Sequence, residues 1–278
     1  MPNLYNEQTV DKEIEMAKRM GVTLQSWGFA LSLVFVSPAA AQEEGGGRLE
    51  GFIGLGVLSE PTFSGSDEME TGVLPVIDLT WDDRFFVSTD RGVGAYVFGG
   101  LDAPLRFGVG VGYDFTERNP DDDDRLTGLE KVEASPALKL FAEYVVGFAD
   151  VELEVVRAFG GDGHEGTTAE LSVGFEAPVG ERAFFSVSPF VTWADGKYTD
   201  ALYGVSAAGA AASGLEAYDA GNGLNQIGVD VTGAYFVTER VSIVGTVEYG
   251  RLLGDAADSP VSFDDSQVEV SAGLLFSF

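Results

Sequence analysis

Apolar residues alternate with polar or small residues, with a period of two, along most of this chain. Between positions 105 and 115 every second residue is apolar, and the residues between them are Arg, Gly or Asp. A strand with one apolar and one polar face has this period, whereas a helix would scatter the apolar positions. The same pattern recurs at 49–57, 151–155, 169–175, 183–193, 227–235, 241–249 and 268–278. The sequence therefore predicts an all-β protein.

A secreted β-sandwich also has alternating strands, because one face packs on a core. Three features favour a transmembrane β-barrel instead. The alternating segments are about 9–14 residues long, close to what a tilted membrane-spanning strand needs. Their minor face is Gly, Ser, Thr, Glu and Asp, as expected for a crowded, wet barrel interior. Finally, short connections (147–150, 178–182, 238–240) alternate with long ones (117–131, 196–223, 254–266), like the periplasmic turns and outer loops of outer-membrane barrels.

The number of strands must be even if both chain ends lie on the same side of the membrane. Segment 84–98, read as one strand, gives an odd number. A break at 89–92, where Thr-Asp-Arg-Gly has the chemistry of a turn, makes two short strands of it and gives twelve in all. Ten strands would remain if this hairpin does not span. We therefore expect one antiparallel up-and-down barrel over residues 42–278.

The first 41 residues have the organisation of a signal peptide. Basic residues, including Lys18 and Arg19, precede an apolar run at 22–36, and an Ala-x-Ala cleavage site ends at Ala41. The run is shorter than the roughly 20 apolar residues of a membrane-spanning helix. We predict cleavage after Ala41 and export of the chain, with Met16 or Met20 as alternative starts.

Composition excludes several classes of function. Lys and Arg sum to 16 against 45 for Asp and Glu, and the net charge of −29 would repel nucleic acid. A hydrophobic content of 45% indicates an ordered chain rather than an acidic disordered one. Without cysteine there is no disulfide, thiolate zinc site or cysteine nucleophile, and the single histidine excludes a multi-histidine metal site. We expect no cofactor, no metal and no catalytic residue.

Short motifs follow one another in a recognisable order. They comprise Pro61, Phe63, Gly65 and Ser66, then Leu74 and Pro75, Gly92 and Gly94, Tyr113, then Tyr198, Tyr203, Gly204 and Val205, and finally Ser259 and Pro260. Through them the sequence resembles the MipA/OmpV family of Gram-negative outer-membrane proteins (MltA-interacting protein, OmpV). Leu202 departs from the family, which commonly has a second Tyr there. The terminal Phe278 resembles the C-terminal signal that such barrels present to their assembly machinery.

This resemblance implies a location and a role. The location is the outer membrane of a Gram-negative bacterium, in contact with lipid and lipopolysaccharide. In some family members the barrel is a scaffold that bridges a lytic murein transglycosylase and a penicillin-binding protein. The family supplies no catalytic residue that could be carried over, so the resemblance implies a non-enzymatic protein of the cell envelope.

Acidic residues are frequent on the minor face of the strands, where bases are few. They include Glu152, Glu154, Glu170, Asp230 and Glu248. If the lumen holds water, such a lining would favour cations, and a cation-preferring porin or small-solute channel is the alternative function. The same acids could instead belong to a hydrogen-bonded plug. Twelve strands lie near the size at which side chains stop filling a barrel, so size does not decide between the two.

Two polar loop segments could in principle carry chemistry. His164 lies among glycines at 160–166, and a hydrolase would need it to activate a serine, but no motif places one; we favour a solvated loop histidine. Asp121, Asp122, Asp123 and Asp124 could bind Ca²⁺ or Mg²⁺, but they lack the ligand spacing of an EF-hand, which favours a solvated charge run.

Aromatic residues gather near the ends of the expected strands, where an interfacial girdle belongs. They are Trp81, Phe85, Phe86, Tyr113, Phe115, Phe141, Tyr144, Phe148, Phe184, Phe185, Trp193, Tyr235, Phe236, Tyr249, Phe276 and Phe278. In the long loop 196–223, the Ala- and Gly-rich run 207–214 predicts a flexible segment that folds into the lumen as a constriction.

Overall fold

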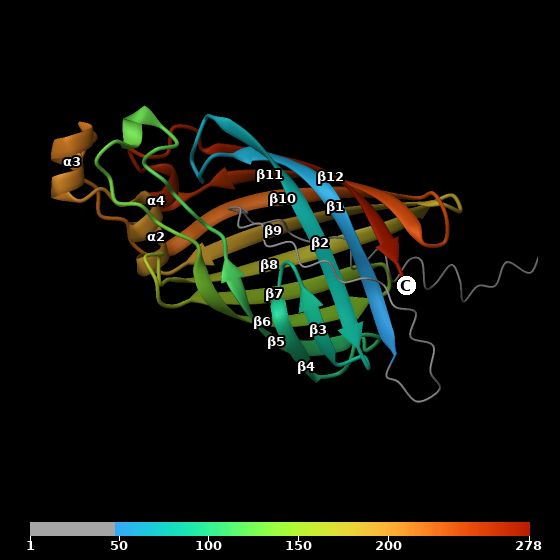
Figure 1. The fold of residues 1–278 in the computed structure, drawn as a ribbon. Coiled ribbons are helices and arrows are strands. Elements are labelled where there is room, and N and C mark those ends of the chain that lie inside the picture. Colours follow the sequence, from blue (N-terminus) through green and yellow to red (C-terminus); the bar gives the residue numbers. More distant parts are fainter. Residues whose placement is uncertain (1–47) are drawn as a thin grey trace, which may run out of the picture.

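The computed structural model describes residues 48–278, so the expected signal peptide 1–41 and the cleavage after Ala41 lie outside the described residues. Twelve antiparallel strands each pair with their neighbours in sequence, and β1 pairs with β12 to close a barrel (Figure 1). The strands are β1 Leu49–Pro61, β2 Met69–Trp81, β3 Phe85–Ser88, β4 Gly92–Phe98, β5 Leu105–Asp114, β6 Ser135–Val146, β7 Ala149–Ala158, β8 Thr167–Val179, β9 Ala183–Ala194, β10 Gly223–Phe236, β11 Val241–Leu252 and β12 Ser266–Ser277. The predicted all-β barrel of twelve strands is confirmed.

The alternation along each strand separates the outer surface from the lumen. In β11, Ser242, Val244 and Thr246 are buried, whereas Ile243 and Val247 are exposed on the outside. Across the barrel, exposed Val, Leu, Ile and aromatic side chains form an apolar outer surface. Such a surface is stable only against lipid, so the barrel is a membrane-spanning one.

The two ends of the barrel differ. At the end that we call the turn end, β6 and β7 are joined by two residues, and the first residues of β1 lie beside Phe278, whose backbone N–H donates to the Gly51 carbonyl at 3.1 Å. The opposite loop end carries all the helices of residues 48–278: η1 Asp124–Leu126, α2 Gly196–Tyr203, α3 Ala207–Ser213 and α4 Gly254–Ala257. Within residues 48–278, no helix is both long and apolar enough to cross a membrane.

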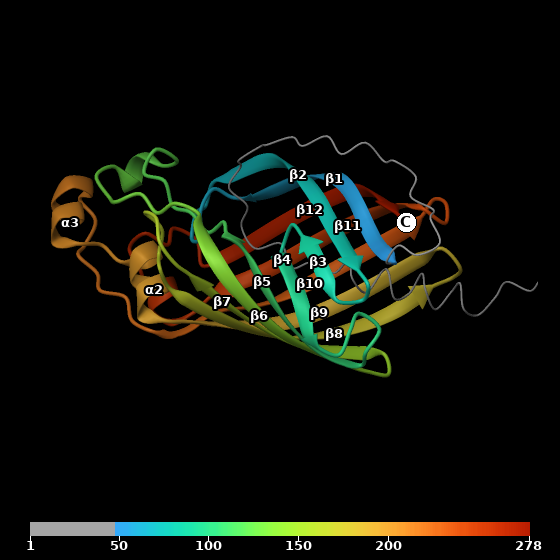
Figure 2. The ribbon, with the colours of Figure 1, turned by 60° about the horizontal axis from the view of Figure 1, so that its bottom comes forward.

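The predicted constriction at 207–214 is wrong. This run forms α3, which projects beyond α2 on the side away from the barrel (Figures 1 and 2). Ser206 caps its first turn, because its Oγ accepts a hydrogen bond from the Gly209 N–H at 3.1 Å, and alanine is the strongest helix former. The composition that suggested flexibility therefore encodes a short external helix.

The predicted break at 89–92 is confirmed, and its hairpin is short. β3 has four residues and β4 seven, so this hairpin reaches only part of the way along the wall. β2 pairs with β3 only from Asp78 to Trp81. Within the part of the chain that the structure describes, the first nine residues of β2, Met69 to Ile77, therefore have no partner strand on that side, although they pair with β1 along their whole length.

Four residues assigned to the aromatic girdle are instead in the lumen. Phe86, Phe141, Phe184 and Phe236 are all buried. Adjacent residues of a strand face opposite sides, so in a doublet such as 184–185 only one ring can reach the lipid. Phe185 does so and is 42% exposed, whereas Phe184 points inward.

Candidate functional site

The loops at the loop end pack together into a cap over the barrel mouth, formed by residues 62–68, 115–134, 195–222 and 253–265. The cap has a hydrophobic core of its own. Its buried members are Phe63, Leu126, Leu129, Val132, Ala194, Tyr198, Leu202, Tyr203, Val205, Ala220, Leu252, Ala256 and Val261. A core built from every long loop and the adjoining strand ends fixes those loops relative to one another.

Tyr203 is the centre of this cap. Its side chain is fully buried, and its hydroxyl shares a hydrogen bond of 2.7 Å with the Ser64 hydroxyl. The Ser259 hydroxyl donates to the Tyr203 carbonyl at 2.5 Å. Gly65 adopts φ +98°, and its N–H donates to Gln267 Oε1 at 3.0 Å. Four of the sequence motifs, at 61–66, 198, 203–205 and 259–260, are thus brought together in one structure.

No pattern in the sequence predicts a role for Arg118, yet this buried residue links two loops of the cap. Its side chain is buried, and its guanidinium donates to the Leu202 carbonyl at 2.5 Å and to the Glu130 carbonyl at 3.3 Å. Burial lowers the pKa of Arg118 to about 10, so the guanidinium remains charged at neutral pH. It joins loop 115–134 to the C-terminal turn of α2.

An ion pair joins two cap loops on the outside. The Arg125 guanidinium binds Asp67, from the β1–β2 loop, and Asp123, and it lies 3.5 Å above the centre of the Phe263 ring. Hydrogen bonds from Arg125 hold the pKa of Asp67 and of Asp123 below their ordinary value. The bridge therefore stabilises the cap above the ordinary carboxyl pKa and weakens as the pH falls through the lowered ones.

This bridge predicts a pH-dependent loosening of the cap. The Leu126 and Leu129 amides both donate to backbone carbonyls of loop 115–134. We expect their hydrogen exchange, corrected for the intrinsic effect of pH, to speed up only below a pH of about 4, as the pH falls through the lowered pKa values of Asp67 and Asp123 and these carboxylates become protonated. In Arg125→Ala the exchange should already be fast at pH 7 and the step absent. An equal step in Arg125→Ala would contradict the role given to the bridge.

The expectation that His164 is a solvated loop side chain is wrong. It is buried, its Nδ1 accepts the Gly166 N–H at 3.0 Å, and its Nε2 lies 3.1 Å from Asp114 Oδ2. The acceptor role of Nδ1 places the proton on Nε2, which donates to Asp114. Both nitrogens are thus occupied, and the ring packs edge-on against Tyr198. A general base needs one nitrogen facing its nucleophile, so this arrangement favours a structural role.

Residues of the acidic run at 121–124 form hydrogen bonds within their own loop. The Asp123 carboxylate accepts from the Arg125 N–H at 2.8 Å and caps η1. The Asp122 N–H donates to the Asn119 carbonyl at 3.0 Å. Among residues 48–278, no group of three His, Asp or Glu side chains is arranged to hold a metal ion.

Below the cap, the lumen contains an ion network around the tip of the β3–β4 hairpin. Arg91, in this tip, binds Glu143 at 2.6 Å and also binds Glu152, and it lies 4.0 Å above the Phe141 ring centre. Arg106 binds Glu143 from the other side. Lys139 donates to the Asp90 carbonyl at 2.6 Å. Glu152, one of the possible lumen acids, is therefore paired with a cation of the tip, as the alternative of a plug expects.

The other expected lumen acids lie opposite one another on neighbouring strands. Glu154 pairs in register with Glu170, and Asp230 with Glu248. The Thr192 hydroxyl donates to Glu170 at 2.9 Å, and the Gln226 amide donates to Glu248 at 3.4 Å. Glu170 and Glu248 also line a polar cavity beneath the cap, with a water-accessible volume of about 60 Å³. That volume holds only a few water molecules.

Two apolar clusters lie in the turn-end half of the lumen, beside the ion network of Arg91, Arg106 and Glu143. Phe52, Phe184, Phe236, Val244 and Leu275 form one buried cluster there. A second cluster consists of Phe86, Tyr96, Leu101 and Phe141, with ring centroids of the three aromatic residues 5.5–5.7 Å apart. Aromatic and aliphatic side chains therefore occupy space in the lumen that a water-filled porin leaves polar.

The remaining motif residues lie on the barrel wall. Gly92, with φ +74°, follows the hairpin tip, and a Cβ there would come within 2.6 Å of the Gly112 Cα. Gly94 is the next residue but one in β4. Tyr113 is 52% exposed on the outer surface and stacks on Phe115. Leu74 and Pro75 lie on the stretch of β2 that pairs with β1 but not with β3.

A comparison with known protein families shows which family the chain belongs to. The model of the family described as "MltA-interacting protein MipA" matches residues 53–278. The chain belongs to this family. The match covers nearly all of the barrel and cap, in agreement with the resemblance carried by the motifs. No curated protein matches the chain.

Solved structures similar to the chain are outer-membrane proteins of low sequence identity. The high-pH structure of OprB from Pseudomonas putida has a TM-score of 0.38 and 12% identity, over 74% of this chain and 59% of OprB. OmpT of Vibrio cholerae has a TM-score of 0.34 and 11% identity, over 85% and 99% of the two chains. OmpF of Salmonella typhi in complex with daunomycin has a TM-score of 0.34 and 11% identity, over 81% and 57%. The chain thus spans about three fifths of OprB.

Proposed function

We propose that this protein is a non-enzymatic scaffold in the outer membrane of a Gram-negative bacterium, where lipid and lipopolysaccharide surround it. Its partners would be peptidoglycan-remodelling enzymes, namely a lytic murein transglycosylase together with a penicillin-binding protein. The family's description as MltA-interacting supports the first partner. The single observation that carries the proposal is the filled lumen. A barrel that is capped and plugged can bind other proteins at its surface, but it gives solutes no path through the membrane.

The turn end is the docking surface in this proposal. Outer-membrane barrels place their short turns in the periplasm, where peptidoglycan enzymes work. Phe148, between β6 and β7, is 72% exposed, and Val237, between β10 and β11, is 42% exposed. Charged residues of the same turns and of the β8–β9 turn, such as Glu239 and Glu181, are also exposed at this end. An exposed apolar group within a charged rim is typical of a protein-binding surface. In the same proposal, Phe278 at this end serves as the assembly signal.

Site-specific photo-crosslinking tests this docking surface. A photoreactive phenylalanine analogue at Phe148 or Glu239 should form an adduct whose second protein is identified by mass spectrometry as a lytic murein transglycosylase. The matched control is Ala211, which is exposed on α3 at the opposite end. Adducts from the turn end but not from Ala211 are expected. A transglycosylase adduct of equal yield from Ala211, or none from Phe148 and Glu239, would refute the proposed surface.

A further inference from the structure

The barrel wall is interrupted beside β2. The last rung of the β2–β3 ladder is formed by Thr89, because the Ile77 N–H donates to its Oγ1 at 2.6 Å and the Thr89 N–H donates to the Ile77 carbonyl at 2.8 Å. Beyond Ile77, towards the loop end, β2 has no strand partner on that side within the described chain. β5 is the next full-length strand, but no pairing joins it to β2. The wall therefore has a gap between the hairpin tip and the loop end.

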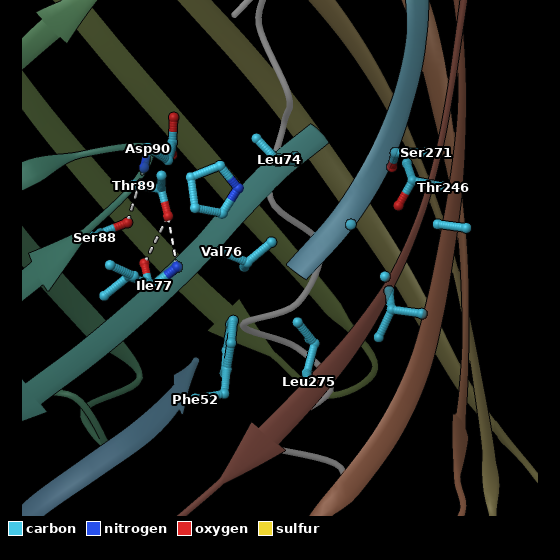
Figure 3. Close-up of a pocket in the computed structure, with 15 residues that line it drawn as sticks. Phe52, Leu74, Val76, Ile77, Ser88, Thr89, Asp90, Thr246, Ser271 and Leu275 are labelled. Carbon is cyan, nitrogen blue, oxygen red and sulfur yellow. Dashed lines mark hydrogen bonds between the residues drawn. The ribbon is translucent and has the colours of Figure 1, made fainter. Parts of the chain in front are cut away.

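An apolar pocket extends from this gap into the lumen. One side is formed by the tip residues Ser88, Thr89 and Asp90, which face Leu74, Val76 and Ile77 of β2 (Figure 3). Phe52 and Leu275 form its floor, and Thr246 and Ser271 lie on the far wall (Figure 3). Its water-accessible volume is about 50 Å³. The lining shares Phe52, Val244 and Leu275 with the apolar cluster of the turn end.

The pocket opens on the lipid-facing surface. Outward side chains on both sides of the gap are apolar and exposed: Val73 and Ile77 on β2, Val87 and Val93 on the hairpin, and Val111 on β5. These residues lie in the band that contacts the hydrocarbon of the bilayer. The pocket is thus continuous with a surface that acyl chains already cover.

Pro75 makes the gap less suitable for an added peptide strand than for a hydrocarbon chain. Residues two apart in an antiparallel strand direct their backbone groups to the same side, so Pro75 and Val73 face the gap as Ile77 faces Thr89. Pro75 has no N–H and interrupts the row of donors that an added β-strand would need. A peptide strand is therefore disfavoured, whereas a hydrocarbon chain needs no donor.

We propose that the gap is a lateral entrance through which the end of one acyl chain of a bilayer lipid reaches the apolar pocket. The acyl chain would pass between Val76 and Thr89 and lie against Leu275 and Ser271. Burial of its methylene groups against Phe52 and Leu74 would stabilise the bound state. Occupation would also shield the unpaired backbone edge of β2 at the depth of the bilayer. This inference does not depend on the docking of a periplasmic partner.

Photolabelling in bilayers tests the entrance. Residues 42–278 are reconstituted into phosphatidylethanolamine bilayers that contain a phosphatidylethanolamine with a diazirine at the end of one acyl chain. After irradiation, the labelled residues are mapped by mass spectrometry. We expect labels on Ser271 and Leu275 at several-fold the yield on Thr192, which lines the polar cavity instead. Val247, on the outer surface beside Thr246, is the positive control.

The second part of the experiment uses a variant whose entrance is blocked by a larger side chain. Val76→Trp places an indole in the mouth of the pocket and should reduce labelling of Ser271 and Leu275 to the level of Thr192, while Val247 stays labelled. Val73→Trp, on the outward face of the same strand, should leave every label in place. The proposal is overturned if wild-type Ser271 and Leu275 are labelled no more than Thr192. It is also overturned if a folded Val76→Trp barrel retains their labels.

Discussion

Replacing Arg91 by alanine is expected to lower the free energy of unfolding by about 3–5 kcal/mol, the usual effect of removing one partner from a buried ion pair. Arg91 is the cation between Glu143 and Glu152, and the Glu143 side chain is only 7% exposed. Without the guanidinium, Glu143 keeps only Arg106, and Glu152 loses the one cation it binds in the described chain. The lost stacking on Phe141 adds to the effect.

Urea unfolding of the reconstituted barrel measures this change. The matched control is Arg48→Ala, which breaks an ion pair with Glu50 at the exposed start of β1 and should cost at most about 1 kcal/mol. Adding Glu152→Gln to Arg91→Ala should recover part of the loss, because the uncompensated carboxylate is then removed. Equal stability of Arg91→Ala and Arg48→Ala would show that the network does not support the barrel.

Much of the barrel could be predicted from the sequence, because strand alternation is a local property. Each segment with period two became a strand, and the Thr-Asp-Arg-Gly turn at 89–92 divided 84–98 into β3 and β4. The inward placement of Phe86 and Phe184 was also within reach, since neighbours in a strand face opposite sides. The error lay in assigning both rings of each doublet to the girdle.

The cap could not be predicted in the same way. Its contacts join residues far apart in the chain, such as Ser64 with Tyr203 and Tyr203 with Ser259. No local pattern encodes these pairs. His164 looked solvated because glycines surround it, and Arg91 looked like an ordinary turn residue although it reaches into the lumen. The family motifs include residues of three of the four cap loops, but they do not indicate how these loops pack together.

The second large effect concerns conduction through the lumen. The cap covers the loop end, the network of Arg91 lies in the lumen beside β5, β6 and β7, and the cluster of Phe52, Phe184 and Phe236 lies towards the turn end. The polar and apolar cavities between them have water-accessible volumes of only about 60 and 50 Å³. An ion would have to shed its hydration shell to pass such constrictions, which is unfavourable without a continuous row of ligands. We therefore expect the barrel not to conduct.

Single-channel recording tests the filled lumen, on which the scaffold proposal rests, most directly. Residues 42–278 are refolded into planar bilayers, their insertion is confirmed by protease protection, and current is recorded in a KCl gradient. The expected result is a folded barrel without discrete current steps, in wild type and in Glu152→Gln and Glu170→Gln alike. Discrete, cation-selective steps in the wild type that weaken in these two variants would contradict the filled lumen and support the cation-preferring porin.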